Sequence, residues 1–197
     1  MVAPGSYRER SRARLRDDLI AAARDLAVQR GWSDVRVADV ARAVGVSRQT
    51  VYNEFGDKAG LTEALATAEI THFVTQVRDR LAAAGDIRSG AYAAIRHTLD
   101  EAARNPLINS ILTSARGTGD ELLPYLTTRS DVVLQAAGAV VEAWLTPLTP
   151  QASEQLRHTA VDAVVRLTVS HIVLPDATAE QTATTLADLL VRLVRHD

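Results

Sequence analysis

Residues 36–58 constrain the fold of this chain more than any other stretch, because they describe two short helices joined by a tight turn. The first helix carries an apolar face at positions i, i+3, i+4 and i+7, formed by Val37, Val40, Ala41 and Val44. Gly45 interrupts this pattern where a residue in the left-handed conformation commonly ends a helix. The pattern therefore predicts a helical hairpin whose two arms meet at Gly45.

The second arm of the hairpin is a polar helix over residues 48–55, and Ser47 is its candidate N-cap. Val51 and Phe55 are spaced i, i+4 and form its inner face. The remaining positions carry groups that can bond bases or phosphates, namely Arg48, Gln49, Thr50, Tyr52 and Asn53. A helix-turn-helix places such a helix in the DNA major groove, but ordinary helical hairpins are also common. The spacing alone leaves both alternatives open.

The order of residues in this stretch resembles the DNA-binding domain of TetR-family transcriptional regulators. The matching features are Asp39-Val40-Ala41, Gly45-Val46-Ser47, Thr50-Val51-Tyr52, Phe55, and Lys58 with Leu61 after it. One position departs from the family, because Arg36 stands where the family usually has a threonine that caps the helix and contacts phosphate. Arginine has no acceptor, so the first helix is expected to start with Asp34 or without a side-chain cap.

The resemblance implies a dimer that binds a palindromic operator in double-stranded DNA. We expect Arg48 and Gln49 to contact base edges, and Asn53 to contact a base or a phosphate. The remaining expected DNA contacts are to phosphate, from Arg36, Ser47, Thr50, Tyr52 and Lys58. For Lys58 the alternative is an exposed lysine with no ligand. The five arginines at residues 8, 10, 12, 14 and 16 are either a basic arm that contacts DNA or a solvated helix start.

The composition predicts an all-α protein. Apolar residues make up 47% of the 197 residues while aromatic residues make up only 4%, so Leu, Val and Ala must build the interior. Alternating strand patterns with turn dipeptides are absent. The expected architecture is an N-terminal three-helix helix-turn-helix domain followed by a C-terminal helical bundle for ligand binding and dimerisation, about nine helices in all. The expected boundaries are residues 1–57 for the DNA-binding domain, 58–84 for a connecting helix and 85–197 for the C-terminal domain.

Charge and composition also limit the functions to be considered. Residues 1–58 hold 11 basic and 8 acidic residues while the rest holds 11 and 16, so positive charge gathers where the motif lies. No cysteine, apolar span or signal-peptide pattern is present, which predicts a cytoplasmic, soluble protein without membrane contact. Scattered histidines and the lack of a nucleophile-elbow sequence predict no catalytic residue, metal or cofactor. The alternative function is a small-molecule-binding helical protein, or an enzyme, with a non-functional DNA-binding head.

The resemblance also implies that the C-terminal domain senses a small molecule. An apolar ligand, elongated or aromatic, would relieve repression by changing the separation of the two DNA-binding heads. Large apolar and aromatic side chains are the candidate pocket walls, with His97 among the possible polar anchors. The predicted ligand-binding residues are Phe73, Tyr92, Ile95, Leu99, Leu107, Ile111, Tyr125, Trp144, Thr168 and His171. Each apolar member of this set has plain core packing as its alternative role.

Two helices at about residues 151–174 and 178–196 carry apolar stripes and are apolar on more than one side. This pattern fits a homodimer interface in which two helices from each subunit form a four-helix bundle. The predicted interface residues are Leu156, Ala163, Leu167, Leu186, Leu189, Leu190 and Leu193. Burial within the single chain is the alternative.

Overall fold

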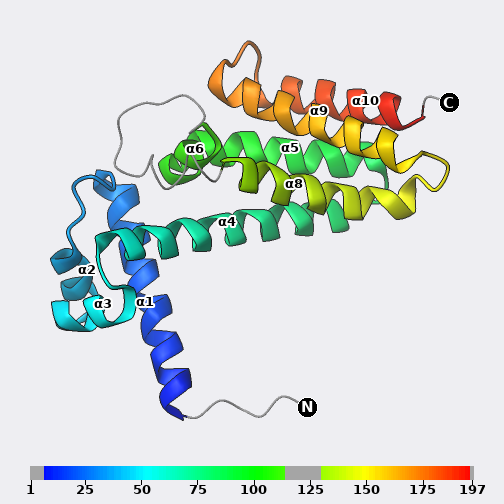
Figure 1. Ribbon diagram of the computed structural model, residues 1–197. Coiled ribbons are helices and arrows are strands. Elements are labelled where there is room, and N and C mark those ends of the chain that lie inside the picture. The colour runs from blue at the N-terminus through cyan, green and yellow to red at the C-terminus, as the bar shows by residue number, and fades with distance from the viewer. Residues whose placement is uncertain (1–6, 114–129, 196–197) are drawn as a thin grey trace. The chain divides into compact units, whose positions relative to one another are not determined.

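The computed structural model describes residues 7–113 and 130–195, with side chains described as far as Asn109 and again from Leu134. In these ranges the chain forms nine α-helices, one 3-10 turn and no strand, which confirms the all-α prediction (Figure 1). The helices are α1 (Tyr7–Arg30), α2 (Val37–Val44), α3 (Arg48–Phe55), α4 (Lys58–Ala82), α5 (Ile87–Arg104), α6 (Pro106–Thr113), α8 (Ser130–Leu145), α9 (Glu154–Val173) and α10 (Ala179–Arg195). The 3-10 turn η2 (Thr146–Leu148) follows α8.

The described chain divides into two compact units, and the boundary falls within α4 after Ala68. The N-terminal unit contains α1, α2, α3 and the first part of α4. Its core consists of fully buried aliphatic side chains, including Leu19, Val40, Val51, Leu61 and Leu65. Helices α2 and α3 have only eight residues each, so neither could bury its apolar face without the packing of α1 and α4.

Trp32 fixes the connection between α1 and α2 against the start of α4. Its ring is buried, and its indole Nε1 donates a 3.0 Å hydrogen bond to the hydroxyl of Thr62. The same hydroxyl donates to the carbonyl of Lys58 at 2.8 Å. A buried indole N–H needs such a partner, so this contact orients the ring as well as satisfying its donor.

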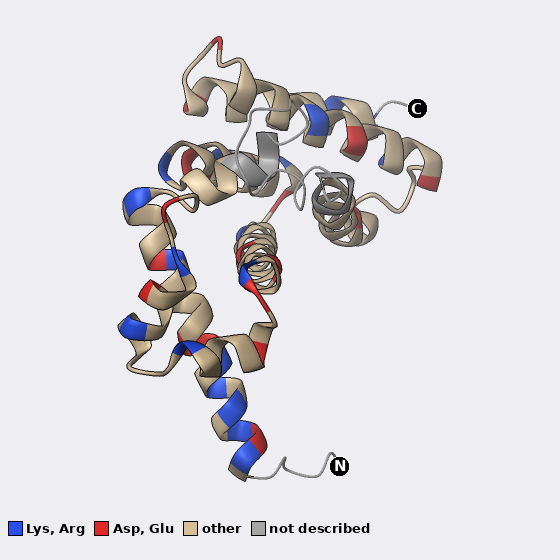
Figure 2. Cartoon of the chain, turned by 60° about the vertical axis from the view of Figure 1, so that its left-hand side comes forward, with Lys and Arg blue, Asp and Glu red and all other residues tan. Residues whose placement is uncertain are grey.

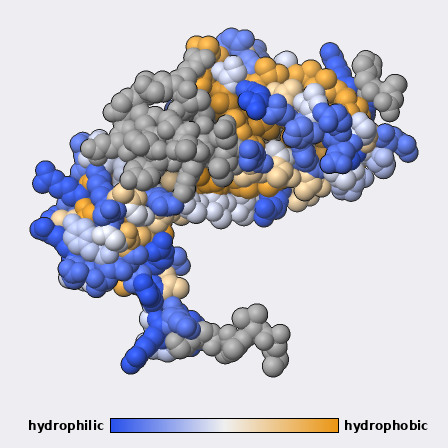
Figure 3. Space-filling view, viewed as in Figure 1, coloured by the Kyte–Doolittle hydropathy of each residue, from blue (hydrophilic) through white to orange (hydrophobic). Residues whose placement is uncertain are grey.

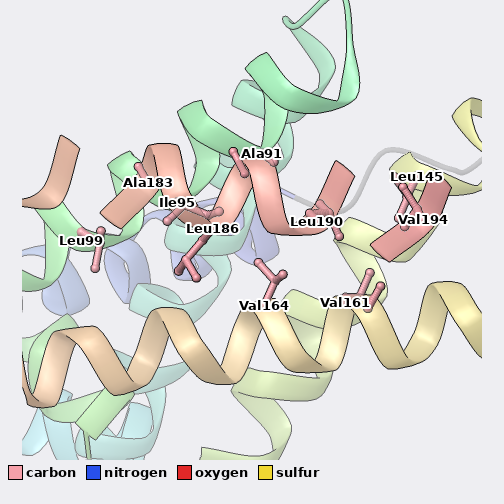
Figure 4. Close-up of a cluster of buried hydrophobic side chains, with 12 residues drawn as sticks. Ala91, Ile95, Leu99, Leu145, Val161, Val164, Ala183, Leu186, Leu190 and Val194 are labelled. Atoms are coloured by element: carbon pink, nitrogen blue, oxygen red, sulfur yellow. The ribbon is translucent and has the colours of Figure 1, made fainter. Parts of the chain in front are cut away.

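The C-terminal unit packs α5, α9 and α10 around a cluster of apolar side chains (Figure 4). Helix α10 supplies Ala183, Leu186, Ala187, Leu190 and Val194, which recur with helical spacing and point toward the cluster. Gly90 allows α5 to pack closely against Trp144 of α8. A Cβ atom added at this glycine would clash with the indole ring. Any larger residue at position 90 would therefore displace α5 or the indole.

Packing within the C-terminal unit revises the predicted dimer surface. Leu186 and Leu190 are 3% and 1% exposed and belong to the core of their own chain, so these two leucines do not present a surface to a partner. The stripe on α9 behaves differently, because Leu167 is 38% exposed. Of the predicted interface residues, those that keep exposed surface are Leu156, Ala163, Leu167, Leu189 and Leu193.

Hydrophobic side chains emerge at the surface of the C-terminal helices in the view of Figure 3, whereas the N-terminal unit there is mainly hydrophilic. Within the described ranges, no helix has both the length and the apolar character that crossing a membrane requires.

Candidate DNA-binding site and ligand cavity

The turn between α2 and α3 has the backbone geometry of a helix-ending glycine. Gly45 adopts φ +77°, a left-handed conformation that side-chain-bearing residues rarely adopt. Its amide donates to the carbonyl of Arg42 at 3.2 Å, and the amide of Val46 donates to the carbonyl of Ala41 at 2.9 Å. These bonds satisfy carbonyls left open at the end of α2, so the turn is fixed by local chemistry.

Ser47 caps the start of α3. Its backbone is extended, and its hydroxyl oxygen accepts a 3.1 Å hydrogen bond from the amide of Thr50. The hydroxyls of Ser47 and Thr50 also lie 2.9 Å apart. The first turn of an eight-residue helix thereby gains the partner that it needs for stability.

Replacing Ser47 by alanine is expected to destabilise the N-terminal unit by about 0.5–2 kcal/mol, because the amide of Thr50 loses its acceptor. Chemical denaturation followed by far-UV circular dichroism measures this loss. Ser47→Asp is the matched control, since a carboxylate can accept the same bond and should retain most of the stability. Equal stability of the alanine variant and the parent protein would show that the cap contributes nothing.

The outer face of α3 presents polar groups while its inner face is buried. Val51 and Phe55 are buried. Arg48, Gln49, Tyr52 and Asn53 are exposed, and Thr50 is half-buried. The amide nitrogen of Gln49 donates to the carbonyl oxygen of Asn53 at 2.9 Å, so these two side chains already lie in one orientation. A short helix with this exposed set can offer both donors and acceptors to base edges in the major groove.

Lys58 lies in the first turn of α4, at the positive end of the helix dipole. Its ammonium is placed 5.7 Å from the ring centroid of Trp32 and 3.5 Å from the carbonyl oxygen of Ser33. Asp57 caps this helix, because its carboxylate accepts from the amide of Gly60 at 2.8 Å. A cation at a helix N-terminus is a suitable partner for a phosphate, since both the ammonium and the nearby amides attract an anion.

Arg36 is the N-cap residue of α2, so the helix begins at Val37 without a side-chain cap, which is the second of the two predicted alternatives, and not with Asp34. The carboxylate of Asp39 reaches back to accept the amide of Arg36 at 3.2 Å and also pairs with the guanidinium of Arg30 at 2.8 Å. The bond from the Arg36 amide, with help from Arg30 and Arg42, holds the pKa of Asp39 below its ordinary value. The guanidinium of Arg36 accepts no capping bond and remains exposed.

The C-terminal unit contains an apolar cavity of about 70 Å³. Of the predicted ligand-binding residues it brings together Phe73, Ile95 and Thr168. Among the described residues that line it, the polar side chains are Thr98 and Thr168, whose hydroxyls donate to the carbonyls of Ala94 and Val164 at 2.9 and 2.8 Å. Those hydroxyls donate to carbonyls of their own helices, and no described residue of the cavity wall is charged.

Several other predicted ligand-binding residues lie away from this cavity. Leu99 and His171 border a separate surface groove, where His171 pairs with Asp176 at 2.9 Å. Tyr92 and Trp144 pack against the core cluster, and Leu107 is buried. Ile111 and Tyr125 fall outside the described side chains.

Sequence reasoning missed the small aliphatic residues that form most of the cavity. They include Val77, Ala94, Val141, Val161, Val164 and Leu190. Their helical spacing was visible in the sequence, as for Val161, Val164 and Thr168 on α9. Large apolar side chains are the obvious pocket candidates in a sequence, whereas space for a ligand opens where side chains are small.

His97 is 7% exposed and stacks against Phe73 with ring centroids 6.0 Å apart. Burial, followed by the nearby charge of Arg80, lowers the pKa of His97, so the imidazole is neutral at pH 7. Its Nε2 has no hydrogen-bond partner. Among the described residues no group of three or more histidines and carboxylates is placed to bind a metal ion.

Comparisons with known proteins agree with this arrangement. A sequence profile described as "Bacterial regulatory proteins, tetR family" matches residues 19–65, which include the helix-turn-helix. A second, described as "Bacterial Tetracyclin repressor, C-terminal domain", matches residues 86–192.

Individual relatives extend over nearly the whole chain. The HTH-type transcriptional regulator AlkX of Mycobacterium tuberculosis is 35% identical over 93% of this chain and 87% of its own length. The crystal structure of the TetR-family repressor AlkX from a Dietzia strain is similar with a TM-score of 0.67 and 28% identity, covering 90% of this chain and 96% of that one. A Mesorhizobium loti structure at 15% identity shares the fold with a TM-score of 0.69, covering 92% and 96%. The chain belongs to the TetR family of transcriptional regulators, which is not a class of enzymes.

Proposed function

We propose that the protein is a dimeric, sequence-specific repressor that binds a palindromic DNA operator and is released from it by a small apolar ligand. The exposed polar face of α3, held by the Ser47 cap above the buried Val51 and Phe55, carries this proposal. In this assignment residues 1–57 bind DNA, residues 58–84 connect, and residues 85–197 bind the ligand and the second subunit.

The DNA contacts follow from the chemistry of each exposed group. Arg48 can bond guanine through two parallel hydrogen bonds, and Gln49 can bond adenine in the same manner. Asn53 is bonded to Gln49 and thereby orients it, or bonds a base or phosphate itself. The phosphate contacts are assigned to residues with donors at the starts of α2 and α4 and along the first turns of α3, namely Arg36, Ser47, Thr50, Tyr52 and Lys58.

A dimer is proposed because a palindrome has two half-sites about 34 Å apart, and each needs its own copy of α3, here called the reading helix. Leu156, Ala163 and Leu167 on α9, with Leu189 and Leu193 on α10, supply apolar surface that the single chain leaves partly uncovered. A homodimer would bury this surface around a two-fold axis.

The ligand is proposed to be apolar because Phe73, Ile95, Thr168 and the aliphatic wall offer it no charged partner. The Dietzia AlkX structure supports this class of ligand, since that repressor is described as implicated in the biodegradation of n-alkanes. A molecule larger than the cavity must displace its walls, and the displacement would change the separation of the two reading helices. A shift of a few ångströms is enough to misalign two half-sites.

The test begins with duplexes selected by the purified protein from a random library. We expect a palindromic consensus, two subunits per duplex, and affinity that falls steeply between 50 and 200 mM salt. Decan-1-ol should then release the complex in a concentration-dependent manner. A lack of salt-dependent DNA retention would reject the assignment as a repressor, whereas unchanged retention with decan-1-ol and other apolar probes would reject the ligand class alone.

A further inference from the structure

The first turns of α1 carry a concentration of positive charge that helix chemistry disfavours. Five arginines and one glutamate occupy residues 7–16 (Figure 2). Cations lie there at the positive end of the helix dipole, and arginines four residues apart repel each other. Arg8, Arg12 and Arg14 are all exposed. A bound anion would offset both penalties.

Helical geometry sorts these arginines into two faces. Successive residues turn by about 100°, so Arg8, Arg12 and Arg16 form one stripe, whereas Arg14 points about 160° away from Arg12. The stripe lies on the side of α1 that contacts α3. Arg12 pairs with the Glu54 carboxylate through its Nε at 2.8 and 3.0 Å.

Arg16 adds two further contacts with the end of α3. Its guanidinium donates to the carbonyl of Glu54 at 3.0 Å and lies 4.5 Å from the centroid of the Phe55 ring. Arg12 and Arg16 therefore join α1 to the reading helix, and Arg12 neutralises the one acidic side chain of α3. Without that pair, Glu54 would repel the phosphate backbone near the site.

Arg8 lies one helical turn before Arg12, and helical geometry puts it on the same stripe as Arg12 and Arg16, the two arginines that contact α3. We propose that the start of α1 is a second DNA contact, in which Arg8 bonds a phosphate that flanks the bases read by α3. The inference rests on the proposed function and adds to it a contact outside the helix-turn-helix. Phosphate is the partner because a guanidinium on a rigid helix matches its two oxygens and needs no access to a groove.

The experiment compares Arg8→Ala with Arg14→Ala, a matched control in the same helix with the same residue type and exposure. The affinity of each variant for the selected duplex is measured by fluorescence anisotropy at several salt concentrations, with at least ten flanking base pairs on each side. Loss of one phosphate contact per subunit should lower the salt slope by about 2 per dimer and the affinity at 0.1 M salt by about 10- to 50-fold. Arg8→Lys should retain most of the slope, because it keeps the charge.

Each outcome decides a separate point. A normal slope for Arg8→Ala, or equal losses in Arg8→Ala and Arg14→Ala, would overturn the assignment of Arg8 to a specific phosphate. Failure of the parent protein to bind any duplex would instead reject the proposed function. Unchanged circular dichroism of both variants confirms that a lost slope reports DNA contact and not unfolding.

Discussion

Alanine at Arg48 or at Gln49 is expected to weaken binding to the cognate duplex by about 1–3 kcal/mol for each substitution, since each would remove the bidentate base contact proposed for that residue. The same substitution should barely change affinity for a scrambled duplex, because phosphate contacts supply most non-specific binding. The ratio between cognate and scrambled affinities therefore falls with the cognate affinity. Fluorescence anisotropy on both duplexes measures this ratio.

Gln49→Ala has a second consequence within α3. Gln49 donates to Asn53, so its removal also releases the Asn53 side chain from its present orientation. The base preference at two neighbouring positions should then relax together. Asn53→Ala tests this coupling, because the double variant should lose less than the sum of the two single losses.

The phosphate-binding assignments predict the opposite pattern. Lys58→Ala and Tyr52→Phe should lower affinity for cognate and scrambled duplexes alike, since a phosphate carries no sequence information. The control for Gln49→Ala is Gln155→Ala, which also removes an exposed glutamine but lies on α9 in the C-terminal unit. Undiminished cognate affinity after combined substitution of Arg48, Gln49 and Lys58 would contradict the reading role of α3.

The turn and its helices could be predicted from sequence because their determinants are local. The end of α2 at Gly45, the start of α3 after Ser47 and the start of α5 after Asp86 follow from a glycine and two capping residues that lie next to these helix ends. The polar outer face of α3 follows from the same local spacing.

Contacts between distant segments could not be predicted in this way. Arg12 and Glu54 are 42 residues apart, and Arg88 and Asp188, which pair at 2.6 Å, are 100 residues apart. Periodicity shows which side of α10 is apolar but not whether its partner is the same chain or a second copy. For this reason the apolar stripe predicts Leu190 at a dimer interface, whereas the side chain packs inside its own chain.

Substitution of Leu190 is also expected to have a large effect, in this case on stability and on ligand binding, because Leu190 belongs both to the core cluster and to the cavity wall. Leu190→Ala is expected to destabilise the C-terminal unit by about 2–5 kcal/mol, through lost burial and the space left behind. Leu19→Ala is the matched control, since Leu19 is fully buried in the N-terminal unit and does not line this cavity. Thermal unfolding monitored by circular dichroism should show a comparable loss in both variants.

The two variants should differ once an apolar probe is added. In Leu190→Ala the vacated space merges with the existing cavity, whereas in Leu19→Ala it remains the volume of one truncated leucine, which is too small for a ten-carbon chain. Leu19→Ala keeps the cavity of the parent protein, so decan-1-ol should stabilise it as much as it stabilises the parent. At the same decan-1-ol concentration Leu190→Ala should gain more, because its enlarged cavity binds the probe more tightly, and each tenfold fall in the dissociation constant adds about 1.4 kcal/mol. The enlarged cavity should also release DNA at lower decan-1-ol concentrations than in the parent protein. An equal gain in both variants at one decan-1-ol concentration would show that the space left at Leu190 does not enlarge the binding site, and would separate this cavity from the control of DNA binding.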